Sequence, residues 1–260
     1  MIAVDHIAAF YPEPMRGNAG FRKHILKEYV QLLVLDHLAA TRYVRKIAFI
    51  GGTCLRLVKG IDRFSEDLDF YCKGLSKEEF FAMSEDVIAF LRRHGLKVET
   101  RDKETRRLAA FRRGLHFPEL PFELGLSGHR EERFLLKLEA QDQEIGYTPT
   151  TAFVKGCGLF FPFPVPPDGV MCAMKIAAML ARGKGRDFYD VMFLLAQTQP
   201  DYGLLAARCG ICNLQELKAA AETCVRSVDL RQKQRDFEHL LFHRENSRRI
   251  LRVGEFIQSL

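Results

Sequence analysis

Apolar residues recur every three to four positions in residues 21–43, which predicts an amphipathic helix with one buried face. Residues 76–93 predict a second helix, because Ser76 is a suitable N-cap and Glu79, three residues later, completes a capping box. Residues 170–260 show the same helical periodicity and little strand signal. The last third of the chain is therefore expected to be helical.

Strands are predicted where short apolar or alternating runs replace this periodicity. The run Ile-Ala-Phe-Ile at 47–50 indicates a buried strand that stops at Gly51-Gly52. A short helix is expected over residues 53–58, with Thr53 at or near its N-cap. Further strands are predicted at residues 64–71, 97–101, 108–117 and 134–140.

Residues 160–167 hold four of the ten prolines, which indicates an extended connection between two lobes. We therefore expect an α+β protein: a mixed-sheet lobe with an N-terminal helix over residues 1–160, and a helical lobe over residues 161–260. A length of 260 residues fits one large domain, or one domain with an appended lobe.

Composition narrows the class of protein. Hydrophobic residues make up 47% and charged residues 28%, which excludes a disordered or fibrous chain. No run approaches 18 apolar residues, so no membrane partner is expected, and the start of the chain has no basic leader. Seven cysteines without disulfide-framework spacing indicate reduced thiols and a cytoplasmic protein. The net charge of +6 mildly favours a polyanionic partner, although many soluble proteins share such a charge.

Asp67 and Asp69 are the first residues whose pattern indicates a binding site. Side chains alternate along a strand, so both carboxylates point to one face while Leu68 and Phe70 point to the other. Two carboxylates side by side repel unless a cation lies between them. Oxygen ligands of this kind suit Mg²⁺ or Mn²⁺.

The Gly51-Gly52-Thr53 turn lies some fifteen residues earlier, at a strand-to-helix junction. Glycines allow a phosphate to approach the backbone, and N–H groups at a helix start attract anions. A phosphate cradle followed by a metal platform predicts a nucleotidyl-transfer site. Glu139, on a neighbouring predicted strand, is the best candidate for a third carboxylate.

A second signal lies in the predicted helical lobe. Lys175 and Arg182 share one helix face, and a lysine in an apolar helix is costly unless it meets an anion. Lys175 could therefore bind a triphosphate, and Arg182 is expected to bind the nucleotide as well. Asp187 and Asp190 lie one turn apart on the next helix and could orient Lys175 or Arg182, and Asp187 is expected to be a catalytic residue. The alternative is a structural salt bridge.

Three further features leave alternatives open. The Cys209/Cys212 pair with His239 and His243 could bind zinc, but the spacing is about twice that of a zinc finger. The basic and aromatic residues Arg106, Arg107, Phe111, Arg112 and Arg113 could bind nucleic acid or form a solvated strand face. The basic residues between 231 and 249 could bind RNA phosphates or cover a soluble surface, on a helix expected over residues 235–252.

The chain resembles the AbiEii/AbiGii family of toxin-like nucleotidyltransferases. The resemblance rests on Lys27-Glu28-Tyr29, on Gly51-Gly52-Thr53, on the block Arg63-Phe64-Ser65-Glu66-Asp67-Leu68-Asp69-Phe70, and on residues 175–190. It implies a DNA polymerase β-like nucleotidyltransferase fold. It also implies the toxin half of a type IV toxin–antitoxin or abortive-infection pair, with a possible cognate antitoxin.

By position, the resemblance implies that Ser65 and Asp67 bind nucleotide and metal, that Asp69 is the second metal ligand, and that Lys175 binds phosphate. One aspartate of the Asp187/Asp190 pair matches a later family aspartate. The expected enzyme uses Mg²⁺ or Mn²⁺ and transfers a nucleotide from an NTP to an RNA acceptor, possibly a tRNA 3′ end. Alternatives are a protein or small-molecule acceptor, or a non-catalytic nucleotide- or nucleic-acid-binding module.

Overall fold

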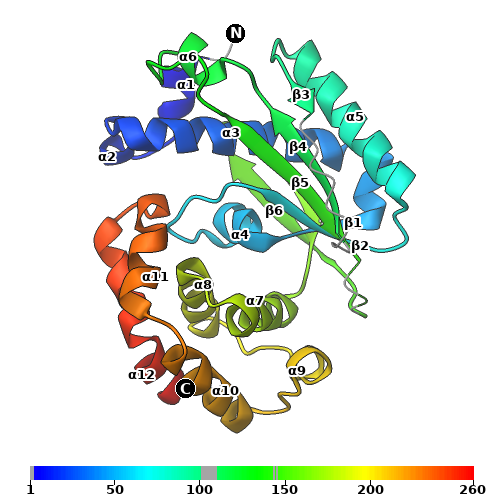
Figure 1. Ribbon diagram of the computed structural model, residues 1–260. Helices are drawn as coiled ribbons and strands as arrows, with labels where there is room; N and C mark the ends of the chain where they lie inside the picture. The colour runs from blue at the N-terminus through cyan, green and yellow to red at the C-terminus, as the bar shows by residue number, and fades with distance from the viewer. Residues whose placement is uncertain (1–2, 101–109, 143, 145) are drawn as a thin grey trace. The chain divides into compact units, whose positions relative to one another are not determined.

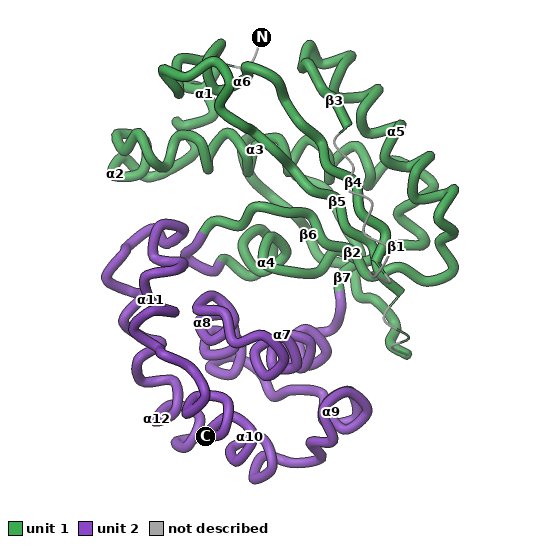
Figure 2. The backbone as a smooth tube through the Cα atoms, viewed as in Figure 1, with its two compact units in different colours: residues 1–60, 64–165 green, residues 61–63, 166–260 purple. Residues whose placement is uncertain are grey.

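The computed structural model describes residues 3–100, 110–142, 144 and 146–260. The chain divides into two compact units, shown in different colours in Figure 2. Unit 1 comprises residues 1–60 and 64–165, and unit 2 comprises residues 61–63 and 166–260. The short segment 61–63 therefore belongs to the second unit although the chain on both sides of it belongs to the first.

Unit 1 is built on a five-stranded mixed sheet (Figure 1). Its strand order is β1 (Ile47–Ile50), β2 (Leu68–Cys72), β5 (Leu135–Gln141), β4 (Phe111–His116) and β3 (Glu99–Thr100). Strands β2 and β5 are parallel, and every other neighbouring pair is antiparallel. A mixed sheet of this kind confirms the predicted α+β class.

The two faces of this sheet differ in chemistry. Leu68, Phe70 and Leu138 point to one face and are at most 1% exposed. Helix α5 covers this face, because Phe80 of α5 packs against Phe111 of β4, which shares the face with Phe70. The polar residues of β2 and β5 alternate with these apolar residues and must therefore lie on the opposite face.

Helices α3 (Ala19–Ala39) and α5 (Lys77–Arg93) confirm the two predicted N-terminal helices. The capping box of α5 is present: Ser76 accepts from the Glu79 N–H, and the Glu79 carboxylate accepts from the Ser76 N–H. Short helices complete the helical part of the unit: α1 (Val4–Ala8), α2 (Glu13–Arg16), η1 (Arg42–Lys46), α4 (Gly51–Cys54), η2 (Leu55–Lys59) and α6 (Leu120–Glu123).

The proline-rich segment at 160–167 is not a plain connection. Its larger part is strand β7 (Leu159–Val165), which pairs with β6 (Thr150–Gly156) in a two-stranded sheet. Pro162 and Pro164 are two residues apart, so their missing N–H groups fall on one edge of β7, where a strand tolerates proline. Strand β6 has no counterpart among the predicted elements, and the boundary of unit 1 follows Val165.

Two other predicted elements differ from the structure at their starts. Residues 64–67 precede β2 instead of belonging to it, and the strand begins at Leu68. The predicted cap role of Thr53 is wrong, because α4 begins at Gly51 with Ile50 at the N-cap. Arg101 and residues 108–109 of the predicted strands, together with Arg106 and Arg107, lie outside the described residues.

Unit 2 is helical among its described residues, as predicted. Its helices are α7 (Asp168–Arg182), α8 (Gly185–Leu195), α9 (Tyr202–Cys209), α10 (Leu214–Arg226), α11 (Leu230–Phe237), η3 (Glu238–Leu240), η4 (Arg244–Arg252) and α12 (Val253–Gln258). The single helix expected over residues 235–252 is wrong. It is interrupted because Leu241 forms a β-bridge with Arg63 and the Phe242 N–H donates to the carbonyl of Asp62.

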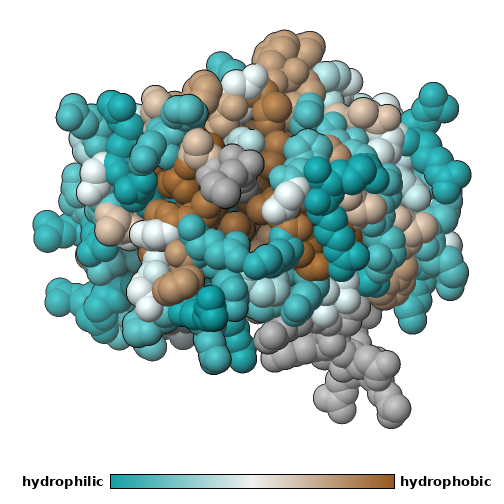
Figure 3. Space-filling view, turned by 90° about the horizontal axis from the view of Figure 1, so that it is seen from above, coloured by the Kyte–Doolittle hydropathy of each residue, from teal (hydrophilic) through white to brown (hydrophobic). Residues whose placement is uncertain are grey.

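Few large apolar side chains of the described residues are exposed: Phe10, Phe122, Phe153, Phe160, Leu251 and Leu260. On the face seen in Figure 3, hydrophilic side chains form most of the periphery and apolar ones gather toward the middle. Within the described residues, no helix combines the length and apolar character that a membrane crossing requires.

Candidate active site

The predicted carboxylates lie on the open face of the unit 1 sheet. Asp69 of β2 and Glu139 of β5 are direct partners in the parallel register, so their side chains project from the same face. Asp67 immediately precedes β2, and its Oδ2 lies 3.3 Å from Lys137 Nζ of β5. The side chains of Asp67 and Glu139 are 27% and 23% exposed, which leaves both accessible to a ligand.

Arg112 of β4 lies close to all three carboxylates, which therefore occupy one region of this face. Its Nε lies 2.7 Å from Glu139 Oε1, and its Nη2 lies 2.9 Å from Oε2. The hydrogen bond to Glu139 raises the pKa of Arg112, and the charges of Glu139, Asp67 and Asp69 raise it further. Sequence reasoning missed this pairing, although it noted Arg112 as basic.

The turn at Gly51 leaves room for the side chain of Asp69. Gly51 has φ +83°, and a Cβ at this position would lie 2.1 Å from Asp69 Oδ2. No other residue fits there, because a side chain would be strained and would collide with the carboxylate. Gly51 is therefore needed to let Asp69 reach its position beside the turn.

Two buried residues hold the segment that leads into β2. Thr53 is 1% exposed, and its hydroxyl donates to the carbonyl of Asp67. Gln31 of α3 is fully buried, and its Nε2 donates to the carbonyl of Ser65 at 3.1 Å. Thr53 thus fixes the backbone that carries Asp67. Gln31 is a positioning residue that no motif in the sequence singled out.

The donor set of this face fits a magnesium or manganese ion, since three carboxylates offer only oxygen ligands. As the side chains stand, the described residues contain no group of three His, Cys, Asp or Glu close enough to hold a metal. The same finding covers the Cys209/Cys212 pair with His239 and His243. In the carboxylate set, Glu139 faces Arg112 and Asp67 faces Lys137, so each has a cation beside it.

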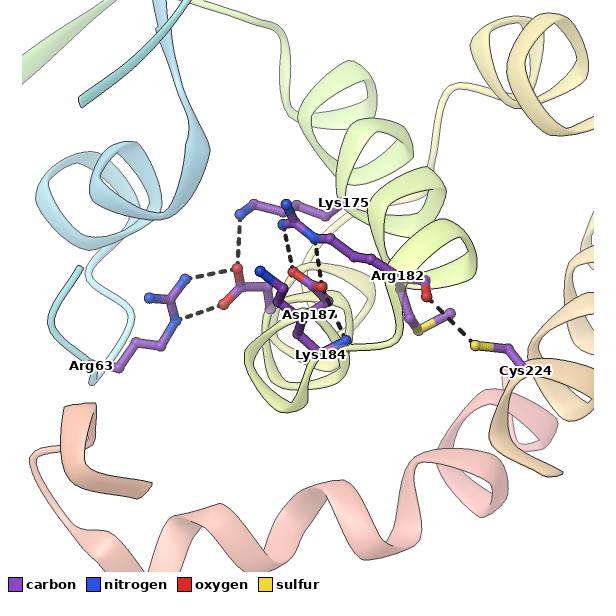
Figure 4. Close-up of polar contacts among 8 residues, drawn as sticks. Arg63, Lys175, Arg182, Lys184, Asp187 and Cys224 are labelled. Atoms are coloured by element: carbon purple, nitrogen blue, oxygen red, sulfur yellow. Dashed lines mark hydrogen bonds and ion pairs between the residues drawn. The ribbon is translucent and has the colours of Figure 1, made fainter. Parts of the chain in front are cut away.

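Unit 2 holds a second group of charges, which is buried (Figure 4). Arg63 donates to both oxygens of Asp190, each at 2.7 Å, and Lys175 Nζ lies 2.8 Å from Asp190 Oδ2. The side chains of Arg63, Asp190 and Lys175 are 1%, 0% and 10% exposed. Burial alone would raise the pKa of Asp190, but the charges and hydrogen bonds of Arg63 and Lys175 hold it below its usual value.

These three side chains form a cluster in which two cations contact the carboxylate of Asp190. We call it the Arg63 cluster. Arg63 opens the block at 63–70, but no local pattern indicates that it pairs with a residue 127 positions away. Asp190 is the aspartate that orients Lys175.

Asp187 has a different role within the same helix. Its carboxylate accepts from Arg182 Nε at 2.8 Å and Nη2 at 2.7 Å, and from the Lys184 N–H at 3.2 Å. Asp187 therefore caps the start of α8 and holds Arg182. Gly185 allows this turn, since a Cβ there would lie 2.0 Å from the carbonyl oxygen of Lys233.

The profile of the "Nucleotidyl transferase AbiEii toxin, Type IV TA system" family matches residues 33–249. The chain belongs to the AbiEii family. It is therefore a nucleotidyltransferase of a toxin family of type IV toxin–antitoxin systems, as the motifs around Asp67 and Lys175 predicted. A comparison with curated protein sequences finds no match.

Solved structures support the fold of this AbiEii protein. It is similar to JHP933 from Helicobacter pylori, with a TM-score of 0.58 and 20% identity over 91% of this chain and 90% of that one. It is also similar to MenT4, a nucleotidyltransferase toxin from Mycobacterium tuberculosis, with a TM-score of 0.62 and 18% identity over 100% and 91%. The expected nucleotidyltransferase fold is confirmed.

Proposed function

We propose that this AbiEii protein is a Mg²⁺- or Mn²⁺-dependent toxin that transfers a nucleotide from an NTP to an RNA acceptor. The observation that supports this most strongly is the carboxylate face of unit 1, where Asp67, Asp69 and Glu139 share one side of the sheet. In this proposal these three residues would hold the metal, which would neutralise phosphate charge and lower the pKa of an acceptor hydroxyl.

The chain's own residues orient the reactants. The backbone at Gly51 and Gly52, together with Ser65, binds the phosphates, while Thr53 and Gln31 hold the strand segment that presents Asp67. The acceptor hydroxyl oxygen then bonds to the α-phosphorus of the NTP as the bond to pyrophosphate breaks. Lys137 and Arg112 neutralise the carboxylates until the metal–nucleotide complex binds.

Lys175 binds the leaving phosphates in this proposal. Its support is the buried position of the Lys175 ammonium, which is 10% exposed, since a buried positive charge is costly unless it meets an anion. Arg63 donates to both oxygens of Asp190, and Asp190 orients the Lys175 ammonium at 2.8 Å. Arg182 of α7 and Asp187 of α8 form an ion pair that joins the two helices carrying Lys175 and Asp190.

An RNA acceptor is supported by the distribution of charge. Residues 230–252 carry seven Lys or Arg against three Asp or Glu, which is +4 of the chain's net +6. A concentration of cations in one segment is the usual electrostatic footprint of nucleic-acid binding. A tRNA 3′ end is one acceptor that this surface could serve, and a cognate antitoxin is expected from the type IV family.

The test is incubation of the protein with total RNA, Mg²⁺ and each α-³²P-labelled NTP in turn, beside Asp67→Ala. Label in one RNA size class with the unaltered protein only would establish the reaction, the nucleotide and the acceptor class together. Label in protein or in a small molecule would show that the acceptor is not RNA. No label in any fraction, with NTP binding retained, would favour a non-catalytic binding module.

A further inference from the structure

A groove on unit 2 lies next to the basic segment. It has a volume of about 490 Å³ and is lined by Met192, Arg249, Arg252, Glu255, Phe256 and Ser259. A hollow of about 230 Å³ continues it and shares Met192, Arg249 and Phe256. Every lining residue belongs to unit 2, on helices α8, η4 and α12 or directly after α8 and α12. The volume lies in the range of sites for small organic groups.

The walls and the rim of this groove differ in character. Met192 and Phe256 line its apolar part, and Phe193 adds a second aromatic ring in the hollow. Arg249 and Arg252 line the same groove and are exposed. Arg249 also donates to the Tyr189 hydroxyl at 3.4 Å, which ties its guanidinium to the edge of the hollow.

The cations of the groove belong to a larger exposed set. Arg231 and Arg235 of α11, and Arg244 and Arg248 of η4, are exposed as well. The carboxylates that could neutralise the rim are few: Glu255 lines the groove and pairs with Arg252 at 2.7 Å, with both side chains more than 65% exposed. An exposed pair of this kind is weak, so Arg252 can exchange Glu255 for a phosphate.

We propose that this groove and its arginine rim bind a single-stranded segment of the RNA acceptor, with one unstacked base in the groove. Sites for single-stranded RNA combine cations that follow the backbone with aromatic side chains on which bases stack. Arg249 and Arg252 contact the phosphates, and Phe256 stacks with the base. The charge complementarity to a polyanion favours RNA over a protein partner. This inference rests on the proposed RNA acceptor.

The test measures RNA binding separately from nucleotide transfer. The probe is a fluorescein-labelled single-stranded RNA of about 12 nucleotides, within the length range of single-strand sites, with a duplex of the same length for comparison. Anisotropy gives the Kd for each probe. Titrations over roughly 50 to 200 mM salt give the number of phosphate contacts.

Phe256→Ala is expected to weaken single-strand binding by about 5- to 150-fold, the usual loss for one stacked base, and to change duplex binding much less. Arg252→Gln is expected to weaken binding several-fold and to reduce the salt slope by about 0.7. Arg226→Gln is the matched control, because Arg226 is equally exposed at 78% and pairs with Glu222 as Arg252 pairs with Glu255. It should leave binding unchanged.

Equal losses with Arg226→Gln and Arg252→Gln would overturn the proposal, because they would indicate diffuse attraction. Unchanged single-strand binding in both Phe256→Ala and Arg252→Gln would also overturn it and would leave the groove to a protein partner. Arg252 is exposed, so its variant is informative even if Phe256→Ala unfolds. If RNA binding depends on the groove but no nucleotide is transferred, the proposed function is refuted and this binding surface is retained. If nucleotide transfer persists in the groove variants, this binding surface is refuted and the proposed function is retained.

Discussion

The carboxylate face of unit 1 and the Arg63 cluster of unit 2 differ in the sign of their main charges and in how deeply these charges are buried. On the carboxylate face, three acids are partly exposed, and each nearby cation lies at the surface with them. In the Arg63 cluster, two cations and one acid are almost fully buried and fixed by short hydrogen bonds. The first brings together three carboxylates, and the second brings together two cations.

This difference indicates which ligand each region lacks. Carboxylates that share one face are stabilised by a divalent cation, and a buried ammonium is stabilised by a phosphate. Each region by itself therefore favours a ligand of opposite charge, and each reaches its geometry by different residues.

Asp69→Asn tests the carboxylate face most directly. The change keeps the shape of the side chain but removes a charge that a metal requires. Nucleotide transfer should fall by roughly 10²–10³-fold or more, as it does when one preorganised electrostatic group is lost. The control is Glu85→Gln, since Glu85 pairs with Arg113 on the covered face of the sheet. Equal activity in both variants would remove Asp69 from the reaction.

Gly51→Ala tests whether the turn exists to place Asp69. The new Cβ would lie 2.1 Å from Asp69 Oδ2, so the carboxylate must move. A shift of about 1 Å can lower activity by about 100-fold. Gly60→Ala is the matched control, because Gly60 also has positive φ, at +75°, but has no neighbour within 4 Å of a Cβ. Both variants should lose stability, measured by urea unfolding, and only Gly51→Ala should lose most of its activity.

Arg63→Met tests the charge of the buried cluster. It removes one of the two cations that contact Asp190 and leaves Lys175 paired with this carboxylate. NTP binding should weaken by about 10-fold, or about 1.4 kcal/mol. Removing one partner of a buried pair also destabilises by about 3–5 kcal/mol, which thermal unfolding would show.

The double variant Arg63→Met/Asp190→Asn separates charge from structure. It removes one cation and one anion, so the Lys175 ammonium no longer faces the carboxylate of Asp190. Affinity for metal-free tripolyphosphate, measured by calorimetry, should recover toward that of the unaltered protein. A double variant that binds no better than Arg63→Met would show that Arg63 only supports the fold. Arg226→Met, on the surface of the same unit, should not alter binding.

The local parts of these two regions could be predicted from the sequence, and their pairings could not. Alternation along a strand placed Asp69 opposite Phe70, and the helical periodicity placed Lys175 on a buried face. Both are properties of neighbouring residues. Arg63 and Asp190 are 127 residues apart, and no local pattern shows that they meet. The same limit applies to Arg112 and Glu139, which meet only through the register of β4 and β5.

Errors in the predicted elements have two origins. Residues 160–167 looked like a connection because proline weakens strands, but β6 pairs with β7 in a local hairpin closed by Cys157-Gly158. The helix predicted over residues 235–252 had suitable periodicity, and it is broken because Leu241 and Phe242 bond to Arg63 and Asp62. Only in the second case does a long-range backbone contact override the local preference.

Arg112→Gln has the smallest expected effect, and it tests whether Arg112 competes with a metal for Glu139. Glu139 would lose its guanidinium partner and become available to a metal, so Mn²⁺ should bind more tightly. The gain should be at most about 5-fold, because the pair is partly exposed and such pairs contribute about 0.2–1 kcal/mol. Mn²⁺ titration followed by electron paramagnetic resonance measures this affinity. Lys46→Gln is the control, since its pair with Glu79 is similarly exposed at 42% and 39% and lies away from the carboxylates. Weaker Mn²⁺ binding in Arg112→Gln would instead show that Arg112 holds Glu139 in its ligating position, and the face would then be a preformed site.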